Sequence, residues 1–437
     1  METIIIGAGL AGSEAALQLA KRNIKVKLYE MRPQKTTGAH VSENCAEFVC
    51  SNSLGSADIT NASGLLKAEM QELGGELINI AHENRVPAGN ALAIDRVGFG
   101  KKVTELIENN ENIELIREEL TKIPEDVPVI IASGPLTSDS LANEIQKFTK
   151  TEHLHFFDAI APIVEKDSIN FDIAFWASRY DKGEASYINC PMDKEQYENF
   201  YKILTTSERI ELKEFEKDAK FFESCLPVEV LASRGIDTLR FGPMKPVGLV
   251  DKRTNNENWA VVQLRQDDAA KSLFNLVGFQ TNLKWGAQKE LIHAIPGLEN
   301  ANIVRYGVMH RNTFINSPQI LNATLNTRSR QDLFFAGQIT GVEGYTESIA
   351  TGMLAGINMA RFLNNESLIT LPQETMLGAL CNYISTSELK HFQPMNSNWA
   401  VVSPIELPKK ERKNKKLKNE LLAKRSIETL KGFLCSI

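Results

Sequence analysis

The pattern that most constrains the fold lies in the first thirty residues, where a strand, a glycine-rich turn, a helix, a second strand and an acid follow one another. Residues 3–6 are β-branched and mostly apolar, and Gly7, Gly9 and Gly12 follow in G-x-G-x-x-G spacing. In such a unit the first glycine permits a tight turn, the second lets the backbone approach a pyrophosphate, and the third lets the helix pack closely on the strand. Glu30 ends the second strand, where an acid accepts from a ribose hydroxyl. The pattern predicts a Rossmann-like dinucleotide site.

The position of the motif favours one dinucleotide. An ordinary glycine-rich turn is the alternative interpretation, but the strand, helix and acid around the glycines favour a nucleotide whose phosphates meet the free N–H groups of the helix N-terminus. The motif begins within seven residues of Met1. Because many flavoproteins open in this way, we expect FAD rather than NAD as the resident ligand.

Two later apolar runs predict further strands of the same domain. Residues 127–132 are followed by Ser-Gly-Pro, and residues 333–336 are followed by Gly337. From Gly344 to Arg361 the chain predicts a helix loaded with Gly, Ala, Ser and Thr. Such a helix can approach a flat ring closely, and its N-terminus can stabilise negative charge on a reduced flavin. Tight helix–sheet packing explains the same composition, and the two interpretations are compatible.

The length of the chain predicts more than one domain. Its 437 residues exceed what one hydrophobic core usually covers. Between residues 151 and 316 the pattern changes to short aromatic and β-rich runs broken by Pro and Gly. We expect an α/β fold: a Rossmann-like, glutathione-reductase-like FAD-binding domain of residues 1–150 and 317–405, interrupted by a smaller α+β insertion domain over 151–316 and followed by a basic helical tail over 406–437.

Composition excludes several classes of protein. Hydrophobic residues make up 43% of the chain and charged residues 24%, without an apolar run long enough for a membrane span. The first strand follows Met1 directly without a signal-peptide pattern, so we expect a cytoplasmic protein with no membrane contact. The six cysteines include no C-x-x-C pair, and neither His293 nor His310 has partners at metal-ligand spacing. Neither a disulfide scaffold nor a metal site is therefore expected.

The net charge of −6 is unevenly distributed. Residues 409–431 contain ten Lys or Arg and three Glu, which gives this segment +7 and leaves −13 for the rest. A basic tail on an acidic body is a candidate contact for RNA phosphates. A solvated amphipathic helix with Leu417, Leu421 and Leu422 on its buried face is the alternative, and it is compatible with RNA contact.

Local patterns predict three elements after the second strand. Residues 31–46 are polar and aperiodic, which indicates a loop. Residues 47–55 indicate a short strand that runs into a turn rich in Ser, Asn and Gly. Residues 63–77 have helical spacing, with Ser63 as the expected N-cap.

Three cysteines suggest thiol chemistry. Cys45 and Cys50 have the C-x-x-x-x-C spacing of flavin-dependent disulfide reductases, so a thiol–disulfide oxidoreductase is one hypothesis. The intervening Ala-Glu-Phe-Val favours a strand over the helix start that surrounds such a pair, which weakens it. Cys225 beside Phe and Leu is by default a buried hydrophobe, whereas a nucleophilic thiolate needs a lowered pKa or an adjacent base. Arg234 and Arg240 are near it in sequence. The remaining cysteines, Cys190, Cys381 and Cys435, are expected to be structural.

Long segments throughout the chain resemble one family, the folate- and FAD-dependent RNA (uracil-5-)-methyltransferases. The matching segments are IIGAGLAGSEAA (5–16), YEMRP (29–33), EFVCSNSL (47–54), PAGNALAIDR (87–96), IIASGPLTS (130–138), YINCPM (187–192), FESCLPVEVLASRG (222–235), FGPMKPVGL (241–249), VVQLRQD (261–267), VGFQTNLKW (277–285), RYGVMHRNTFINSP (305–318), FAGQITGVEGYTESIATGMLAGIN (335–358) and FQPMN (392–396).

The resemblance implies a reaction and its residues. Methylenetetrahydrofolate gives its one-carbon unit to the reduced flavin, the flavin passes it to C5 of a uridine, and NAD(P)H supplies the electrons. By motif match Cys225 attacks uracil C6 and Cys50 helps to remove the C5 proton. This agrees with the chemistry of uracil, because C5 becomes nucleophilic only after a nucleophile adds at C6, and proton removal then needs a base. The cofactor-binding residues expected on this basis are Gly7, Gly9, Gly12, Glu30, Gly337, Gln338, Gly341 and Glu343.

The resemblance has departures and leaves the RNA open. An Arg usually follows the Cys-Ser-Asn-Ser-Leu run where this chain has Gly55, and a Tyr is usual at Phe157. The commoner activity implied is methylation of the T-loop uridine of tRNA, at tRNA position 54. A branch of the family instead methylates a uridine of 23S ribosomal RNA, and a non-catalytic flavin-binding RNA partner is a further alternative. The sequence leaves the oligomeric state open.

Overall fold

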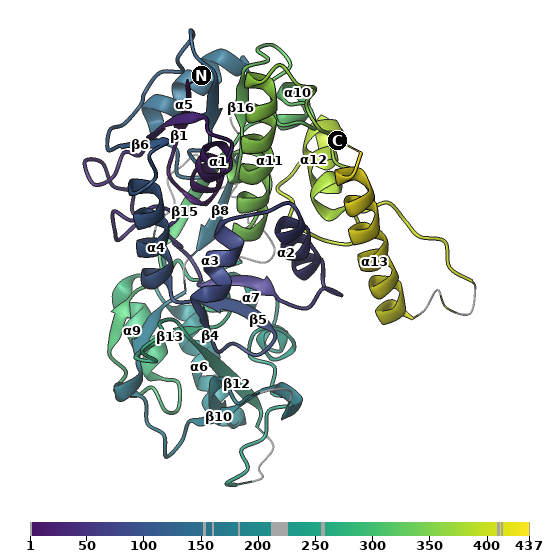
Figure 1. Cartoon of the computed structure of the whole chain (residues 1–437). Helices are drawn as coiled ribbons and strands as arrows, with labels where there is room; N and C mark the ends of the chain where they lie inside the picture. Colours follow the sequence, from purple (N-terminus) through teal and green to yellow (C-terminus); the bar gives the residue numbers. More distant parts are fainter. Residues whose placement is uncertain are drawn as a thin grey trace.

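The computed structural model places two domains at opposite ends of an elongated molecule (Figure 1). It describes residues 2–151, 154–159, 161–181, 184–210, 226–254, 258–408, 411 and 414–436, without the side chains of 155–159 and 309–311. Two sets of predicted residues therefore lie outside the described residues: Cys225, and the basic residues Lys409, Lys410, Arg412 and Lys413. The side chain of Phe157 is likewise not described.

A five-stranded parallel sheet forms the core of the first domain, in the order β16-β7-β1-β2-β6. Its strands are β1 (Glu2–Ile6), β2 (Lys25–Tyr29), β6 (Ile113–Ile116), β7 (Val129–Ile131) and β16 (Leu333–Phe335). Because side chains in a strand alternate, Ile5 and Phe334 enter one buried cluster while Ile6 and Phe335 enter another. Helices cover both faces, α1 (Leu10–Ala20) and α11 (Tyr345–Leu363) on one and α5 (Asp139–Thr149) on the other. The predicted α/β, Rossmann-like class is confirmed.

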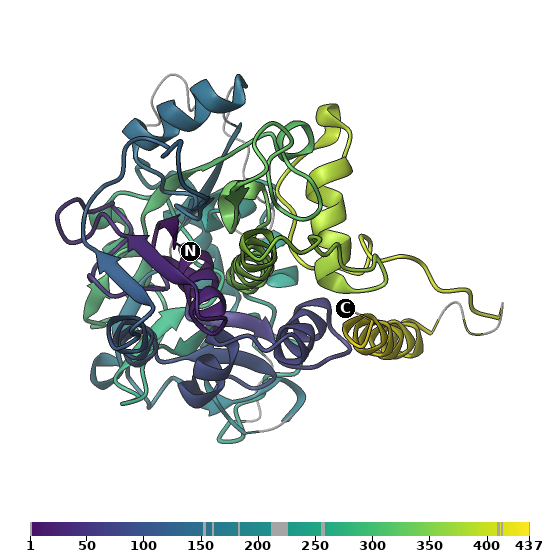
Figure 2. The same cartoon turned by 45° about the horizontal axis from the view of Figure 1, so that its top comes forward.

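Helices α1 and α11 lie side by side over the sheet (Figure 2). A Cβ atom at Gly352 would overlap the backbone of Ala11, and one at Gly356 would lie 2.8 Å from the carbonyl oxygen of Ala15. The small residues of α11 therefore allow close contact with α1, and the same helix also packs on β7 and β16, as its composition indicated. Only the N-terminal turn of α11, with Tyr345 and Ser348, reaches the pocket described below.

A six-stranded antiparallel sheet, in the order β10-β11-β12-β13-β9-β14, forms the core of the second domain. Its strands are β9 (Ile163–Glu165), β10 (Phe175–Ala177), β11 (Tyr187–Met192), β12 (Ala260–Gln266), β13 (Leu273–Leu276) and β14 (Ile303–Arg305), and its helices are α6 (Lys194–Thr206), α7 (Val228–Ala232), α8 (Thr238–Phe241) and α9 (Trp285–His293). Phe200 of α6, Leu291 of α9 and Phe274 of β13 share its buried cluster. These elements come from residues 163–305, and the domain limits at 151 and 316 stay a prediction.

Smaller elements lie between the two sheets. The chain passes between the domains in β8 (Leu154–Ala159) and β15 (Met309–Phe314), which pair antiparallel. A three-stranded sheet and three helices belong to the dinucleotide-binding side: β3 (Ser53–Ser56), β4 (Arg85–Val86), β5 (Ala91–Ile94), α2 (Ala62–Glu72), α3 (Leu77–Glu83) and α4 (Arg96–Glu108). The amide of Asn52, just before β3, donates to Gln266 O of β12 at 2.8 Å, so this region contacts the second domain directly.

The C-terminal segment is packed onto the first domain. Its helices are α12 (Met376–Thr386) and α13 (Lys415–Leu434), and the short helix α10 (Ser317–Ile320), which precedes β16, contacts α12. Helix α13 lies along α2 (Figure 2), and its buried residues include Leu422 and Leu430. The predicted amphipathic helix is confirmed, although Leu417 and Leu421 are only partly buried.

A buried carboxylate ties α2, α12 and α13 together. Glu69 of α2 accepts from the backbone N–H groups of Met376 at 2.6 Å and Leu377 at 2.9 Å, at the N-terminus of α12. The Ser426 hydroxyl of α13 donates to the same carboxylate. Burial raises the pKa of Glu69 to about 7, although these hydrogen bonds oppose the rise.

Two local predictions are wrong. Residues 47–52 are irregular and β3 begins only at Ser53, because this segment is held by side chains from distant elements and not by a neighbouring strand. The predicted helix over 63–77 is two helices, α2 and α3, separated at Gly74, whose φ of +77° is not helical. Ser63 lies inside α2, which begins at Ala62.

Candidate active site

The turn between β1 and α1 has the shape that its glycines predict. Gly7 has a φ of +102°, and a Cβ atom on it would lie 2.6 Å from the carbonyl oxygen of Ala132. A Cβ atom on Gly12 would overlap the carbonyl oxygen of Gly7, so α1 can lie this close to the turn only with glycine there. A Cβ atom on Gly9 would meet nothing within 4 Å, which leaves a space beside the backbone where a pyrophosphate fits.

Glu30 follows β2 and belongs to a buried ion network. Its Oε2 atom accepts from the N–H of Ala8 at 3.0 Å, and its Oε1 atom accepts from Nε of Arg32 at 2.9 Å. Arg32 also donates from Nη1 to Oε2 of Glu47 at 2.8 Å. Burial by itself would raise the pKa of Glu30, but the hydrogen bond and charge of Arg32 hold it below its usual value. Glu30 is therefore an ionised, fixed acceptor suited to a ribose hydroxyl.

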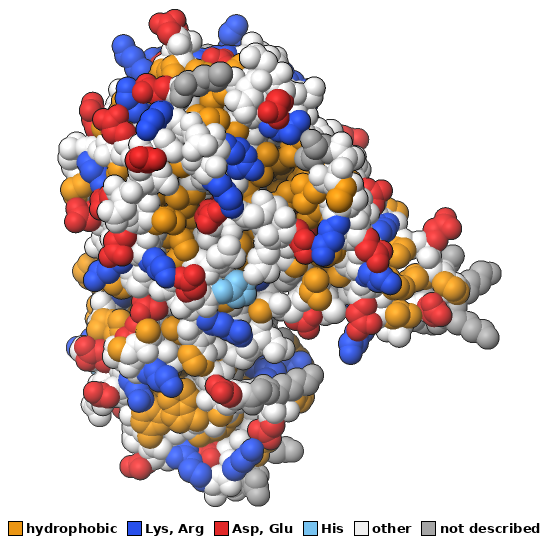
Figure 3. Space-filling view, in the orientation of Figure 1, with side chains coloured by type: hydrophobic (Ala, Val, Ile, Leu, Met, Phe, Trp, Pro, Cys, Tyr) orange, Lys and Arg blue, Asp and Glu red, His pale blue; other side chains and the backbone are white. Residues whose placement is uncertain are grey.

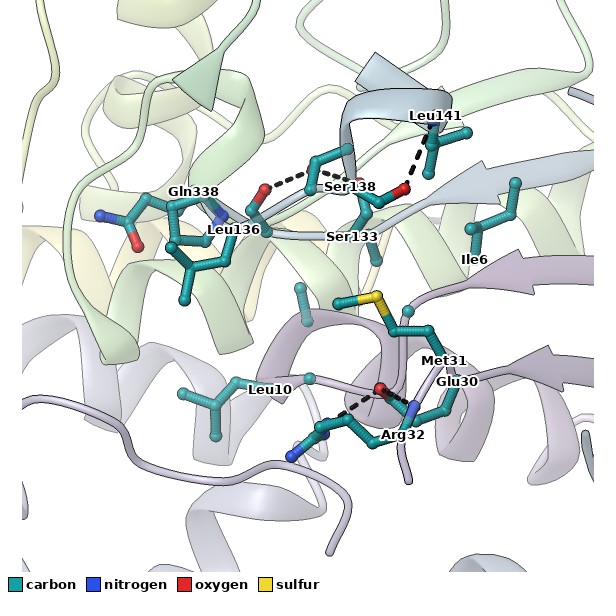
Figure 4. A pocket seen from close by; sticks show the side chains of 18 of the residues that line it. Ile6, Leu10, Glu30, Met31, Arg32, Ser133, Leu136, Ser138, Leu141 and Gln338 are labelled. Carbon is teal, nitrogen blue, oxygen red and sulfur yellow. Dashed lines mark hydrogen bonds and ion pairs between the residues drawn. The ribbon is translucent and has the colours of Figure 1, made fainter. Parts of the chain in front are cut away.

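A long pocket runs past this turn at the carboxyl ends of the parallel strands (Figure 4). One wall is the segment from Glu30 to Arg32, the facing wall runs from Ser133 to Leu141, and Gln338 lies at one end. Open α/β sheets bind ligands at this edge. The predicted cofactor residues that line this pocket are Gly7, Gly9, Glu30, Gly337 and Gln338.

A second pocket continues from the first. The residues that line both are Val49, Pro135, Leu136, Gln338 and Tyr345. Cys50 and Glu343 line only the second, together with residues 53–56 and Asn312. The predicted thiol is thus placed just beyond the end of the dinucleotide pocket where Gln338 lies.

Tyr345 fixes the backbone at Cys50. Its hydroxyl oxygen accepts from the N–H of Cys50 at 2.7 Å and from the N–H of Ser51 at 3.3 Å. The ring packs on Phe48, with a centroid separation of 4.4 Å. Burial raises the pKa of Tyr345 well above its usual range, and the neighbouring Cys50 adds to the rise. The phenol therefore stays protonated beside the thiol.

Of the remaining predicted cofactor residues, Glu343 lines the second pocket, whereas Gly12 and Gly341 line neither. Gln338 donates from Nε2 to the buried carboxylate of Glu343. Gly341 lines neither pocket. It has a φ of +88°, and a Cβ atom there would lie 2.6 Å from the ring of Phe392, so its role is packing against the segment that follows α12. Gly12 likewise shapes the turn without lining a pocket.

The two cysteines of the C-x-x-x-x-C pair have different environments. Cys45 is fully buried, and burial raises the pKa of its thiol to about 11. Cys50 is partly exposed to the second pocket. No disulfide joins these two described cysteines. A disulfide reductase needs a thiolate at each position, and Cys45 is not suited to form one.

Cys225 lies outside the described residues, but the chain on its C-terminal side is placed. Leu226 and Pro227 are buried and lead into α7. Arg240 stacks on the ring of Trp259 with a separation of 3.6 Å and pairs with Asp237, so its charge is engaged there. Of the other cysteines, Cys190 and Cys381 are buried as expected and Cys435 is exposed.

Sequence reasoning missed three residues that hold the site. Tyr345 and Asn52 contact partners far away in the sequence, so no local spacing identifies them. Arg32 contacts Glu30 and Glu47 nearby, but it begins a segment whose polar, aperiodic sequence indicates only a loop. Their only signal was membership of the segments that match the family, GYTES, YEMRP and CSNSL.

The described residues contain neither a membrane-spanning helix nor a cluster of metal ligands. None of the described helices is both long and apolar enough to span a membrane. In the same part of the chain, no cluster of three or more His, Cys, Asp or Glu side chains has the arrangement of a metal site.

Comparisons with known proteins show the family and support the fold. The family model described as "Glucose inhibited division protein A" matches residues 2–367. A protein of Anoxybacillus flavithermus named methylenetetrahydrofolate–tRNA-(uracil-5-)-methyltransferase TrmFO is 57% identical over 99% of this chain and 99% of its own. The Bacillus velezensis protein of the same name is 58% identical over 98% of this chain and 97% of its own. The crystal structure of Aquifex aeolicus GidA has a TM-score of 0.67 at 18% identity, over 98% of this chain and 74% of that one, and supports the fold.

Proposed function

Because this chain belongs to the methylenetetrahydrofolate–tRNA-(uracil-5-)-methyltransferase family, within the wider glucose-inhibited division protein A family, we propose that it methylates C5 of a uridine in tRNA. Methylenetetrahydrofolate is the carbon donor, FAD the bound carrier and NAD(P)H the reductant. The finer proposal is that the target is the T-loop uridine at position 54, and that the enzyme acts in the cytoplasm.

The observation that carries the proposal is the continuity of the two pockets. The first has the glycine turn and the acid that a dinucleotide needs, and the second contains Cys50. Gln338 and Tyr345 line both, so a flavin ring at this end of the first pocket would face the thiol. A disulfide reductase gains no such support, because its second thiol, Cys45, is buried with a raised pKa.

The FAD site fits its ligand on this chain's own geometry. The space beside Gly9, the N-terminus of α1 and the carboxylate of Glu30 would hold the pyrophosphate and a ribose. When bound, FAD supplies redox chemistry and carries the one-carbon unit. Purified protein should be yellow, and a colourless preparation that FAD does not restore would contradict the assignment.

The two proposed catalytic thiols act at different atoms of uracil. The thiolate of Cys225 adds to C6, which makes C5 nucleophilic toward the one-carbon unit. The thiolate of Cys50 then accepts the C5 proton. The transferred carbon must also be released from its carrier and reduced to a methyl group by two electrons that come from NAD(P)H, and Cys225 leaves C6 as the ring double bond re-forms. A stacked uridine must first be flipped out, which costs roughly a few kcal/mol.

Adduct trapping with 5-fluorouridine RNA tests these roles, because fluorine at C5 cannot leave as a proton. We expect Cys225→Ala to lose both methyl transfer and the covalent adduct while keeping FAD. Cys50→Ala should still form the adduct, and Cys45→Ala should match the wild type. An adduct that persists in Cys225→Ala would overturn the assignment, and activity lost only with Cys45→Ala or Cys50→Ala would favour the disulfide reductase.

The basic helix α13 is proposed as a contact for RNA phosphates. Asn419 of α13 donates to Thr60 O at 3.1 Å, beside the start of α2, where Asn61 and Ser63 line the second pocket. On the face drawn in Figure 3, the projecting C-terminal part carries acidic and apolar side chains among its basic ones. Each phosphate contact steepens the salt dependence of binding. Truncation after residue 408 should therefore lower the log–log salt slope.

The choice of RNA is tested in a deletion strain. We expect 5-methyluridine to be lost from tRNA only. Loss from ribosomal RNA only would overturn the tRNA assignment and connect the change at Gly55 with the other branch. RNA binding without methyl transfer, in the presence of folate and NADPH, would favour a non-catalytic flavin-binding partner.

A further inference from the structure

Three arginines converge on the boundary between the domains beside Cys50. Arg96 begins α4 on the dinucleotide-binding side, whereas Arg265 in β12 and Arg305 at the end of β14 belong to the second domain. All three lie in segments that match the family, PAGNALAIDR, VVQLRQD and RYGVMHRNTFINSP. The chemistry proposed above gives none of them a role.

Arg265 is held in place by a fully buried amide. Its Nε atom donates to Oδ1 of Asn52 at 3.1 Å, and the amide of Asn52 donates to Ile94 O at 3.0 Å and Gln266 O at 2.8 Å. Asn52 has no exposed surface. Within the described part of the chain, neither Nη atom of Arg265 has a hydrogen-bond partner. Four N–H donors of a fixed guanidinium are therefore left for a ligand.

The other two arginines are also incompletely paired. Arg96 donates from Nη2 to Asp267 at 2.7 Å and from Nη1 to Phe48 O at 3.4 Å, while its buried Nε has no partner among the described residues. Arg305 donates from Nη2 to Ala39 O at 2.9 Å. Of the three guanidiniums, only that of Arg96 is in a salt bridge with a described carboxylate.

Arg265 interacts electrostatically with the Cys50 thiol. Burial lowers the pKa of Arg265 from its usual value, nearby Arg96 adds to the lowering, and Tyr187, Asp267 and Cys50 oppose it. Burial and the charge of Arg96 likewise lower the pKa of Arg305, against Tyr345, Glu47 and Asp267. An arginine stays protonated even so. Three cations with few counter-charges in a partly buried site favour an anionic ligand.

We propose that Arg265, together with Arg96 and Arg305, binds a phosphodiester of the tRNA next to the target uridine. The proposal rests on the proposed function. A uridine presented to Cys50 brings its own backbone phosphates with it, and the planar fork of arginine matches two phosphate oxygens. The glutamate carboxylate of the folate is the other anion that this reaction brings to the site.

The test compares substrate binding in Arg265→Gln, Arg305→Gln and Arg265→Lys. Lys252→Gln is the matched control, because it removes one positive charge from an exposed residue of the same domain. Dissociation constants for tRNA are measured from low to high salt without folate, so that no methyl transfer occurs during the measurement. The KM for methylenetetrahydrofolate is measured separately. FAD content and the thermal unfolding midpoint establish that each variant is folded.

We expect Arg265→Gln to weaken tRNA binding about tenfold, as for the loss of one charge-assisted hydrogen bond. Its log–log salt slope should fall by about 0.7 to 0.9 for each phosphate that the variant no longer binds. Arg265→Lys should keep the slope but not the full affinity, and Lys252→Gln should resemble the wild type. The KM for folate should not change.

Two outcomes would overturn the proposal. A raised KM for folate with unchanged tRNA affinity would assign the arginines to the folate carboxylate. A lower kcat with both affinities unchanged would show that they act only on the Cys50 thiolate. If wild-type protein binds tRNA but transfers no methyl group, the proposed function fails while the binding comparison still decides the role of the arginines.

Discussion

The glycine turn and the Cys50 segment lie at two ends of one continuous cavity but are built in different ways. The turn over residues 7–12 is shaped by backbone contacts, with Gly7 against Ala132 and Gly12 against Gly7. The segment from Cys50 to Asn52 has no regular structure and is held by side-chain bonds to Tyr345 and Gln266, which are 295 and 214 residues away from their partners. Changes at Gly7 or Gly12 should therefore remove cofactor and fold together. Changes in the Cys50 segment should remove methyl transfer and leave the flavin in place.

The largest effect should come from Gly12→Val. A side chain there overlaps the carbonyl oxygen of Gly7, so α1 cannot keep its place, and we expect a loss of about 4 kcal/mol or more in unfolding free energy. Flavin absorbance per chain and thermal unfolding followed by circular dichroism measure this. Gly9→Ala is the control: its Cβ atom meets no protein atom within 4 Å, so it should fold normally and bind FAD weakly. A stable, yellow Gly12→Val protein would contradict the expectation that fold and cofactor binding are lost together.

Next in size should be Cys50→Ala. Removal of the proposed base should lower kcat by a factor of about 10² to 10⁴, the usual contribution of general base catalysis, with FAD content unchanged. Single-turnover methyl transfer to undermethylated tRNA is the measurement. Cys45→Ala changes a buried thiol outside both pockets and should keep nearly full activity. Loss of flavin from Cys50→Ala would show that the two ends of the cavity are not independent.

Tyr345→Phe should have a smaller effect. It removes the hydroxyl that accepts from the N–H groups of Cys50 and Ser51, and unpaired buried donors cost about 1–3 kcal/mol. We expect kcat to fall about tenfold through misplacement of the thiol, consistent with that range. The KM for tRNA and the flavin content should stay near wild type. Equal activity of Tyr345→Phe and wild type would mean that the backbone at Cys50 is fixed by other contacts.

The smallest effect on activity should come from Glu69, which lines neither pocket. A change at this residue therefore tests stability without changing the glycine turn or the Cys50 segment. The pKa of Glu69 is raised from 4.5 to about 7 in the folded protein, chiefly by burial. The folded state therefore binds the proton more tightly than the unfolded state, so this residue's contribution to stability is largest below about pH 4.5 and falls as the pH rises through 7.

We expect the unfolding midpoint of the wild type, relative to Glu69→Gln, to decline between about pH 5 and 8 and then level off. Differential scanning fluorimetry across this range is sufficient. The ratio of methyl transfer to bound flavin should be the same in both proteins. A difference in midpoint that does not change with pH would show that Glu69 titrates as an ordinary carboxyl group.

What the sequence could predict follows the same division. The structure of residues 3–30 could be predicted from local sequence, because strand, turn, helix and acid are adjacent in the chain and each needs a particular residue type. The structure places Gly7, Gly9 and Glu30 around one pocket, as expected. The strand predicted within residues 47–55 begins only at Ser53, because Phe48 packs on Tyr345 and the N–H of Cys50 donates to the same residue, far along the chain. Glycines in α11 predicted close approach correctly, but only the structure shows that the neighbour is α1.

The contact of α1 with α11 has a consequence for the order in which the protein can be made. Strand β1 pairs with β7, whose other neighbour is β16, and the face of α1 that packs on α11 has no partner until residue 363 has left the ribosome. At a synthesis rate of 5–20 residues per second, that delay is roughly 20 to 70 s. The second domain is complete earlier, so we expect it to fold first on the ribosome. The nascent chain then exposes an apolar helix for that time, which makes it a substrate for chaperones that protect unfinished proteins.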